Sequence, residues 1–367
     1  RFSVPASKSR HWLPIKPGTD IALLLAWMNV LINEELYDKD YVAKYCSGFE
    51  QLATQVQPYN PEWAYLETGL EAAQIRATAH AMAEAAPATL VHPGRHVTWY
   101  GDDTQRCRAI AILNALLGSW GRPGGFYAQE KVALPDFPAP QPAKPKQDWK
   151  TEVQARFPLV STGISNVMVD ASAGPDAFFK GWFVYATNLS TTLPAVREQL
   201  ERAAQSLELV VVVDTMPAEI TGYADVVLPE CTYLERFDDL RNKAERTPTL
   251  ALRMPAFAPK YDSKPAWWIA KGLAEKLGLG DYFPWQDYRE VLDWQLKQVG
   301  SSLAEMEKTG VKAFPRKTPV YFAAGKPVDF RTPSGKIELY SQTLAESGYD
   351  PLPRYVPPQR PPAGHLP

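Results

Sequence analysis

LELVVVVDTMPAEITGYADVVLPECTYLE, residues 207–235, contains two short apolar runs separated by a polar segment with a glycine. The first run, residues 209–213, contains no polar residue, which is typical of a strand buried on both faces of a parallel sheet. Asp214 follows where this predicted strand ends. Ligands of open α/β sheets bind beyond the carboxyl ends of the strands, which favours a ligand contact at Asp214. The alternative is that Asp214 only caps a short helix beginning near Pro217.

A second strand and its connection are predicted upstream. Residues 181–188 read GWFVYATN, and residues 193–205 (LPAVREQLERAAQ) predict a crossover helix, so the order is strand, helix, strand. If the two strands are parallel, Asn188 and Asp214 lie at the same edge of one sheet, which supports the ligand interpretation for both. We therefore predict an α/β fold with parallel sheets flanked by helices.

Length, charge and cysteine usage limit the possible classes. A chain of 367 residues is long enough for two domains or a little more, and its net charge of -2 indicates no general attraction to nucleic acid or anionic membrane. The three cysteines form no CxxC pair and the five histidines show no metal-ligand spacing, so we predict no disulfide framework and no metal ligands here. We also find no membrane-length apolar run and no signal peptide, and the chain begins at Arg1 rather than Met, which suggests a piece of a longer protein.

Two further segments carry candidate binding residues. Gly18, Thr19 and Asp20 precede a predicted helix over residues 21–37, and a helix N-terminus attracts anions such as phosphate, although an ordinary cap explains the same pattern. Arg95 and His96 lie in a glycine-containing loop after a strand-like piece that begins at residue 88. An arginine there could bind an anionic substrate, while a surface salt bridge and a structural histidine are the alternatives.

The remaining segments are assigned by pattern alone. Helices are predicted over residues 71–85, 104–117, 265–280 and 285–300, and the aromatic residues of the last two are expected to pack in the core. Residues 128–150 and 236–253 are interpreted as surface loops, the first of them proline-rich. A turn and a short strand are predicted within residues 330–341, and the last residues read as a linker or a cut end.

Five motifs in order resemble one known family. WLPIKPGTDIALLLAW, HVTWYGDDTQR, GSWGRPGG, ADVVLPECTYLER and FRTPSGKIELYS are similar to stretches of the catalytic subunits of molybdopterin oxidoreductases of the dimethyl sulfoxide reductase family, most of all the polysulfide and thiosulfate reductase branch. The resemblance implies molybdenum held by two molybdopterin guanine dinucleotides and reduction of a sulfur-chain anion. It implies an iron–sulfur electron-transfer subunit, a membrane anchor subunit and a periplasmic location outside the cytoplasmic membrane, as in anaerobic respiration.

The resemblance also implies roles for individual residues. Gly18, Thr19 and Asp20 match a loop that contacts a guanosine end of the cofactor. Arg95 to Trp99 look like the loop that approaches the molybdenum face, with Arg95 as the substrate anchor and His96 as a second catalytic candidate. The contacts that match the second nucleotide, and a basic residue beyond it, are Asn188, Val213, Asp214 and Arg236.

The departures from the family pattern are equally informative. The relatives carry a four-cysteine motif for a 4Fe-4S cluster and a molybdenum-ligating side chain before this region, and a further domain after it, so this chain looks like an inactive central fragment. We expect a dinucleotide-binding α/β part over 1–95, a second α/β domain over 96–330, and the start of a linker over 331–367. A relative acting on arsenic oxyanions or formate, or a non-catalytic scaffold subunit, are the alternatives.

Overall fold

The structure, a computed structural model, describes residues 2–92, 103–141, 149–160, 164–194, 196–323, 326, 328 and 330–358. Two compact units divide the chain. Unit 1 contains residues 1–129 and 317–367, and unit 2 contains residues 130–316. The predicted domain boundaries at residues 95 and 330 differ from this division, and they stay a prediction.

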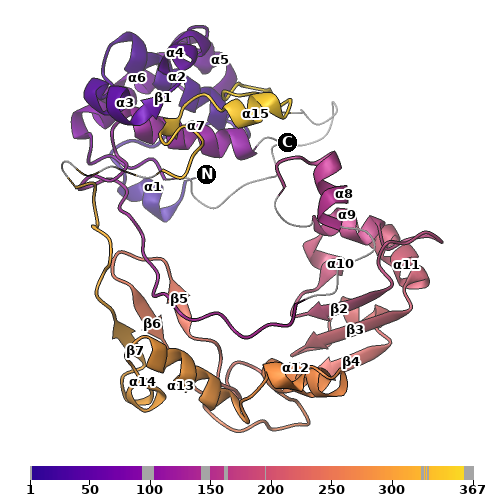
Figure 1. Cartoon of the computed structure of the whole chain (residues 1–367). Helices are drawn as coiled ribbons and strands as arrows, with labels where there is room; N and C mark the ends of the chain where they lie inside the picture. Colours follow the sequence, from indigo (N-terminus) through magenta and orange to yellow (C-terminus); the bar gives the residue numbers. More distant parts are fainter. Residues whose placement is uncertain are drawn as a thin grey trace. The chain divides into compact units, whose positions relative to one another are not determined.

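Unit 1 is mainly helical in its described part (Figure 1). Helix α2 (Asp20–Asn33) lies at its centre, because apolar side chains surround most of this helix and are buried against α7 (Asp103–Leu116), α5 (Pro61–Thr68) and α6 (Ala72–Ala85). Two short strands, β1 (Cys46–Ser47) and β8 (Ile337–Glu338), pair in parallel. The other helices of this unit are α1 (Val4–Lys8), α3 (Lys39–Tyr45), α4 (Phe49–Gln55) and α15 (Gln342–Glu346).

Unit 2 contains the predicted parallel sheet (Figure 1). Its strands β2 (Gly181–Tyr185), β3 (Leu209–Asp214) and β4 (Val226–Pro229) are all parallel, in the order β2-β3-β4. The crossover helix α11 (Arg197–Ser206) connects β2 to β3, which confirms the predicted βαβ unit and the α/β fold class. Val210 and Val212 of β3 are buried on one face with Val184, and Val213 is buried on the other.

Unit 2 contains further helices besides α11. They are α8 (Trp149–Arg156), α9 (Ser165–Asp170), α10 (Leu189–Thr192), α12 (Ala266–Lys276), α13 (Tyr288–Gln298) and α14 (Leu303–Thr309), with 3-10 turns at Glu219–Tyr223 and Gly280–Tyr282.

The predicted surface loop over residues 236–253 is wrong. This segment contains β5 (Arg241–Lys243) and β6 (Thr249–Ala251), which form an antiparallel sheet with β7 (Val311–Ala313). Charged residues dominate the segment, but Leu240, Leu250 and Leu252 are buried against Leu292 and Leu296 of α13. Burial of these few leucines stabilises the strands, and such sparse spacing is not visible as a period in the sequence.

The expected aromatic core of α12 is also partly wrong. Trp268 is 54% exposed, and Trp267 lines a pocket instead of packing in the interior. The predicted helix over residues 21–37 ends earlier, at Asn33. Residues 89–92 form no strand, and the rest of that predicted strand and its loop lies outside the described residues. Residues 131–141 form neither helix nor strand, in agreement with the loop predicted over 128–150, but the loop ends before Trp149, where α8 begins. No helix in the described ranges has the length and apolar character needed to cross a membrane.

Candidate functional site

Asn188 and Asp214 both lie at the carboxyl edge of the parallel sheet, as their positions in the sequence predict. Asn188 follows β2 as the N-cap residue of α10, and Asp214 is the last residue of β3. The amide of Asn188 donates a hydrogen bond from Nδ2 to Glu219 Oε2 over 2.5 Å. Its side-chain oxygen Oδ1 is buried and has no hydrogen-bond partner among the described residues, and the same holds for Oγ of the neighbouring Ser190. Buried polar atoms without partners are costly, so this edge offers ready hydrogen-bonding groups to a ligand.

Asp214 does not cap a helix, so the capping alternative is wrong. Its carboxylate oxygen Oδ1 accepts hydrogen bonds from N and Oγ1 of Thr215, over 2.7 and 3.4 Å. The 3-10 turn that follows begins at Glu219 with Ala218 as its N-cap residue, and no side chain caps it. The carbonyl oxygen of Asp214 accepts from the amide of Glu230 over 3.0 Å, which fixes the end of β3 against the segment after β4.

Val213 lies just before this aspartate and is almost fully buried. Its side chain is 1% exposed and lines an apolar pocket beneath α12, while its carbonyl oxygen accepts from the amide of Ala186 over 3.0 Å. Both parts of Val213 are therefore engaged within the chain. Its role as a nucleotide contact stays a prediction.

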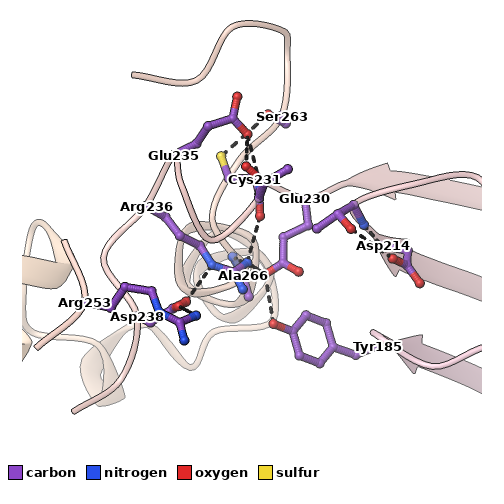
Figure 2. Close-up of polar contacts among 12 residues, drawn as sticks. Tyr185, Asp214, Glu230, Cys231, Glu235, Arg236, Asp238, Arg253, Ser263 and Ala266 are labelled. Carbon is purple, nitrogen blue, oxygen red and sulfur yellow. Dashed lines mark hydrogen bonds and ion pairs between the residues drawn. The ribbon is translucent and has the colours of Figure 1, made fainter. Parts of the chain in front are cut away.

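Glu230 forms the centre of a polar network beside this edge (Figure 2). Its side chain is 1% exposed and is paired with Arg236. One carboxylate oxygen, Oε1, also accepts from the hydroxyl of Tyr185 over 2.8 Å and from the amide of Ala266 over 3.2 Å. Burial first, and then the hydrogen bond to Glu230, raise the pKa of Tyr185 to about 12. The network joins the ends of β2 and β4 to the first residue of α12.

Arg236, a predicted cofactor contact, is engaged by groups of its own chain. Besides Glu230, it contacts Asp238 over 2.8 Å, and it donates to the carbonyl oxygen of Cys231 over 3.0 Å (Figure 2). Burial disfavours its charge, but these carboxylates outweigh burial and raise the pKa of Arg236. Asp238 is shared with Arg253 over 2.7 Å. Arg236 thus stabilises the loop after β4, and its predicted contact with a cofactor stays a prediction.

Sequence reasoning missed Glu230 and Tyr185. The available signal for Glu230 was a glutamate directly after strand β4 and six residues before an arginine. Tyr185 has no comparable signal, because its partner is 45 residues away along the chain.

Gly18, Thr19 and Asp20 lie in unit 1, at the N-terminus of α2. Gly18 has a φ of 81°, a left-handed conformation that glycine adopts without strain. Thr19 is the N-cap residue and is 3% exposed, but its hydroxyl donates to the carbonyl oxygen of Lys16 over 2.7 Å rather than accepting from the helix. No side chain caps this 14-residue helix, and the amides of Ala22 and Leu23 bond instead to the carbonyl oxygen of Thr19 over 3.1 and 3.4 Å. Binding of an anion at this N-terminus stays a prediction.

The predicted residues of the molybdenum face, Arg95, His96 and Trp99, lie outside the described residues. Within the described ranges, no three His, Cys, Asp or Glu side chains come together in a way that could hold a metal ion.

Two adjoining pockets lie beside α12 in unit 2. One of about 440 Å³ lies between Phe183, Tyr185 and Val213 of the sheet and the apolar side chains of the helix. The other, of about 410 Å³, is mostly aromatic and reaches Arg236, Asp238 and Asp239. Both pockets include Tyr185, Ala266 and Ala270 in their linings.

Comparison with known proteins gives a consistent result. A family model described as molybdopterin oxidoreductase matches residues 2–276. The molybdopterin-containing subunit of thiosulfate reductase from Salmonella typhimurium is 34% identical over 94% of this chain and 50% of its own length. Acetylene hydratase from Syntrophotalea acetylenica is 30% identical over 95% of this chain and 51% of its own. The alpha subunit of F420-dependent formate dehydrogenase from Methanocaldococcus jannaschii is 29% identical over 80% and 44%.

A solved structure agrees with these sequence matches. Acetylene hydratase from Pelobacter acetylenicus superimposes with a TM-score of 0.73 and 27% identity, over 97% of this chain and 52% of that one. The chain therefore spans about half the length of the relatives it matches.

Proposed function

Because this chain belongs to the molybdopterin oxidoreductase family, we propose that it is part of the catalytic subunit of an enzyme that reduces thiosulfate or polysulfide. The similarity to a thiosulfate reductase subunit over 94% of the chain supports this choice of substrate. The formate dehydrogenase relative supports formate as the second candidate.

The unpartnered polar atoms at the carboxyl edge of the sheet carry the proposal about the cofactor. Oδ1 of Asn188 is a buried acceptor and Oγ of Ser190 can donate or accept, and the carboxylate of Asp214 lies at the same edge. This set suits the N–H and O–H groups of a nucleotide base and ribose, so these residues fit a dinucleotide form of the pterin cofactor. We propose that they hold one guanine dinucleotide of a molybdenum bis(molybdopterin guanine dinucleotide).

The other nucleotide is proposed to contact Gly18, Thr19 and Asp20, where the uncapped amides of α2 favour negative charge. When bound, the molybdenum group supplies the redox chemistry, and the residues of this chain bind and orient it. Arg95 is proposed to anchor the anionic substrate through its planar guanidinium, and His96 is the second catalytic candidate.

The longer protein is proposed to carry a 4Fe-4S cluster that delivers electrons to the molybdenum. Its proposed partners are an iron–sulfur electron-transfer subunit and a membrane anchor subunit, at the periplasmic side of the cytoplasmic membrane. The thiosulfate reductase relative is itself one subunit of its enzyme, which supports an enzyme of several chains.

The test uses the full-length parent protein. Bound molybdenum and guanine nucleotide are measured first, and oxidation of a reduced dye is then followed with thiosulfate, polysulfide or formate. Asn188→Ala and Asp214→Ala are expected to lower the nucleotide content, whereas Asp176→Ala, an exposed residue of the same unit, is expected to leave it unchanged. Arg95→Ala is expected to lower turnover while metal content stays constant, and Arg202→Ala on the exposed side of α11 serves as its control.

Each outcome has a definite meaning. Turnover with formate but not with sulfur compounds would mean that formate, and not thiosulfate or polysulfide, is the substrate. A parent protein that contains neither molybdenum nor guanine nucleotide would contradict the proposal that it is an enzyme. It would support the alternative of a non-catalytic scaffold subunit. Normal nucleotide content in both edge variants would contradict the cofactor role of the sheet edge.

A further inference from the structure

The aromatic pocket of unit 2 is the strongest candidate for a site beyond the proposed cofactor contacts. It has a volume of about 410 Å³, and rings make up most of its wall, including Phe137, Trp267, Phe283 and Trp285. Within the lining these rings are only loosely in contact, since the centroids of Phe137 and Trp285 lie 6.4 Å apart, as do those of Trp267 and Phe283. Trp285 also packs against Trp294, with centroids 5.0 Å apart, but Trp294 is not part of the lining. Flat faces therefore remain available to a planar group.

The charges around this pocket leave one acid without a cation. Arg236 is balanced by Glu230 and Asp238, and Arg253 also pairs with Asp238. Asp239 forms no ion pair with any side chain of the described ranges, and its carboxylate accepts a hydrogen bond from the hydroxyl of Tyr288.

The nearby cations of the pocket region are likewise paired. Lys271 lies 3.8 Å from Glu275, and Arg289 lies 2.6 Å from Glu307. Arg236 and Arg253 together carry two positive charges, and Glu230, Asp238 and Asp239 carry three negative ones. The net charge is therefore -1, and it lies on Asp239 because the other two acids are paired. The pocket therefore favours a cation and disfavours an anion.

The tyrosine partner keeps this charge available. Burial first, and then the hydrogen bond to Asp239, raise the pKa of Tyr288, so the phenol stays protonated and donates to the carboxylate. A neutral donor orients Asp239 without cancelling its charge, and the second carboxylate oxygen can meet a ligand.

The rings of this region already contact cations of the chain itself. The Lys271 ammonium lies 5.6 Å from the ring of Trp267, and the Arg289 guanidinium lies 5.1 Å from the ring of Phe237. Trp285 and Phe283 hold no such cation among the described residues. A guanidinium combines a flat surface that stacks on aromatic rings with two parallel donors that match a carboxylate, which an ammonium does not.

We propose that this pocket binds the guanidinium group of an arginine side chain presented by a partner polypeptide, with Asp239 as its counter-ion and Trp285 as its stacking surface. Arginine and tryptophan are the residue types that dominate the centres of protein interfaces. The proposal is independent of the substrate and of the cofactor contacts at the sheet edge.

The test measures binding of three small probes to the purified chain by isothermal titration calorimetry. N-acetyl-arginine amide mimics an arginine side chain within a polypeptide. Its citrulline analogue has nearly the same shape but no charge, and its lysine analogue keeps the charge but lacks the planar guanidinium group. The arginine probe is expected to bind with a dissociation constant on the order of 1 mM, and the other two at least about tenfold more weakly.

Variants locate the binding. Asp239→Asn keeps the shape of this exposed side chain but removes its charge, and it is expected to weaken binding of the arginine probe at least about tenfold. Trp285→Leu is expected to weaken it by a smaller factor, because only stacking is lost. Asp262→Asn changes a carboxylate of the same unit that is 96% exposed and outside the pocket lining, and it is expected to have no effect.

Several results would overturn the proposal. Equal binding of the citrulline probe would show that charge does not matter, and equal binding to the Asp239→Asn variant would place the site elsewhere. Tighter binding of free arginine than of the amide would indicate an amino acid ligand instead of a partner polypeptide. Displacement of the probe by guanosine, itself bound more tightly, would assign the pocket to a nucleotide base.

Discussion

Replacing Glu230 by alanine tests how much the buried network holds the sheet edge together. The side chain of Glu230 is 1% exposed and that of Arg236 is 17% exposed, so their pair is shielded from water. Glu230→Ala removes the counter-ion of Arg236 and leaves the hydroxyl of Tyr185 and the amide of Ala266 without their acceptor. Breaking a buried pair costs about 3–5 kcal/mol, and we expect the lower end of this range because Asp238 still balances Arg236.

Urea unfolding followed by circular dichroism measures the loss, and amide hydrogen exchange at Ala266 reports the local opening. Glu230→Gln is expected to cost less, because its amide oxygen still accepts from Tyr185 and Ala266. The double variant Glu230→Met with Arg236→Met should lose less free energy of unfolding than the sum of the losses in the two single variants, since no unpaired charge then remains buried.

A surface pair provides the matched control. Glu201 lies 3.1 Å from Arg197 on α11, with side chains 47% and 88% exposed, so Glu201→Ala should change stability by less than about 0.5 kcal/mol. A loss for Glu230→Ala as small as that of Glu201→Ala would refute the reasoning, and so would unchanged protection of the Ala266 amide.

Two further predictions follow from burial of titrating groups. Burial raises the pKa of the Cys46 thiol to about 12, and Cys231 is fully buried. A thiol reagent at neutral pH should therefore modify the half-buried Cys107 first in the native chain. Mass spectrometry of the labelled peptides would show this order. Labelling of Cys46 as fast as Cys107 would contradict this. Because the pKa of Tyr185 is raised to about 12, the unfolded phenol ionises first, and stability is fully present below the ordinary pKa of ~10 and falls as the pH rises toward 12. Tyr185→Phe should flatten this part of the pH dependence in urea melts, and an equally steep fall in the variant would contradict the assignment.

The sequence predicts the parallel sheet well, because its signal is local. An unbroken apolar run at residues 209–213 has few alternatives to a buried strand, and a helix between two such runs implies a crossover. The shared edge of Asn188 and Asp214 follows from that geometry alone. The local pattern could not decide what Asp214 bonds to, since a cap and a turn place the same residue type at the same position.

Features that depend on distant contacts could not be predicted. β5 and β6 are strands because Leu250 packs on α13, more than forty residues later along the chain. Trp268 is exposed although tryptophan usually packs inside, and nothing in its neighbours indicates the direction of its ring. Glu230 acquires its role from Tyr185, which comes from another strand. Tertiary context decides each of these, and propensity does not.

The division of the chain has a consequence for the order of folding. Unit 2 is continuous, whereas unit 1 is assembled from residues on both sides of it, and β1 at Cys46 receives its partner strand only from Ile337. As the polypeptide leaves the ribosome, unit 2 has its entire sequence once residue 316 has emerged. Helices α2, α5, α6 and α7 are all complete before unit 2 begins, so they can pack during that interval, whereas β1 stays unpaired until β8 is made. The pairing of β1 with β8 is therefore a late step that closes unit 1 after unit 2 has its whole sequence.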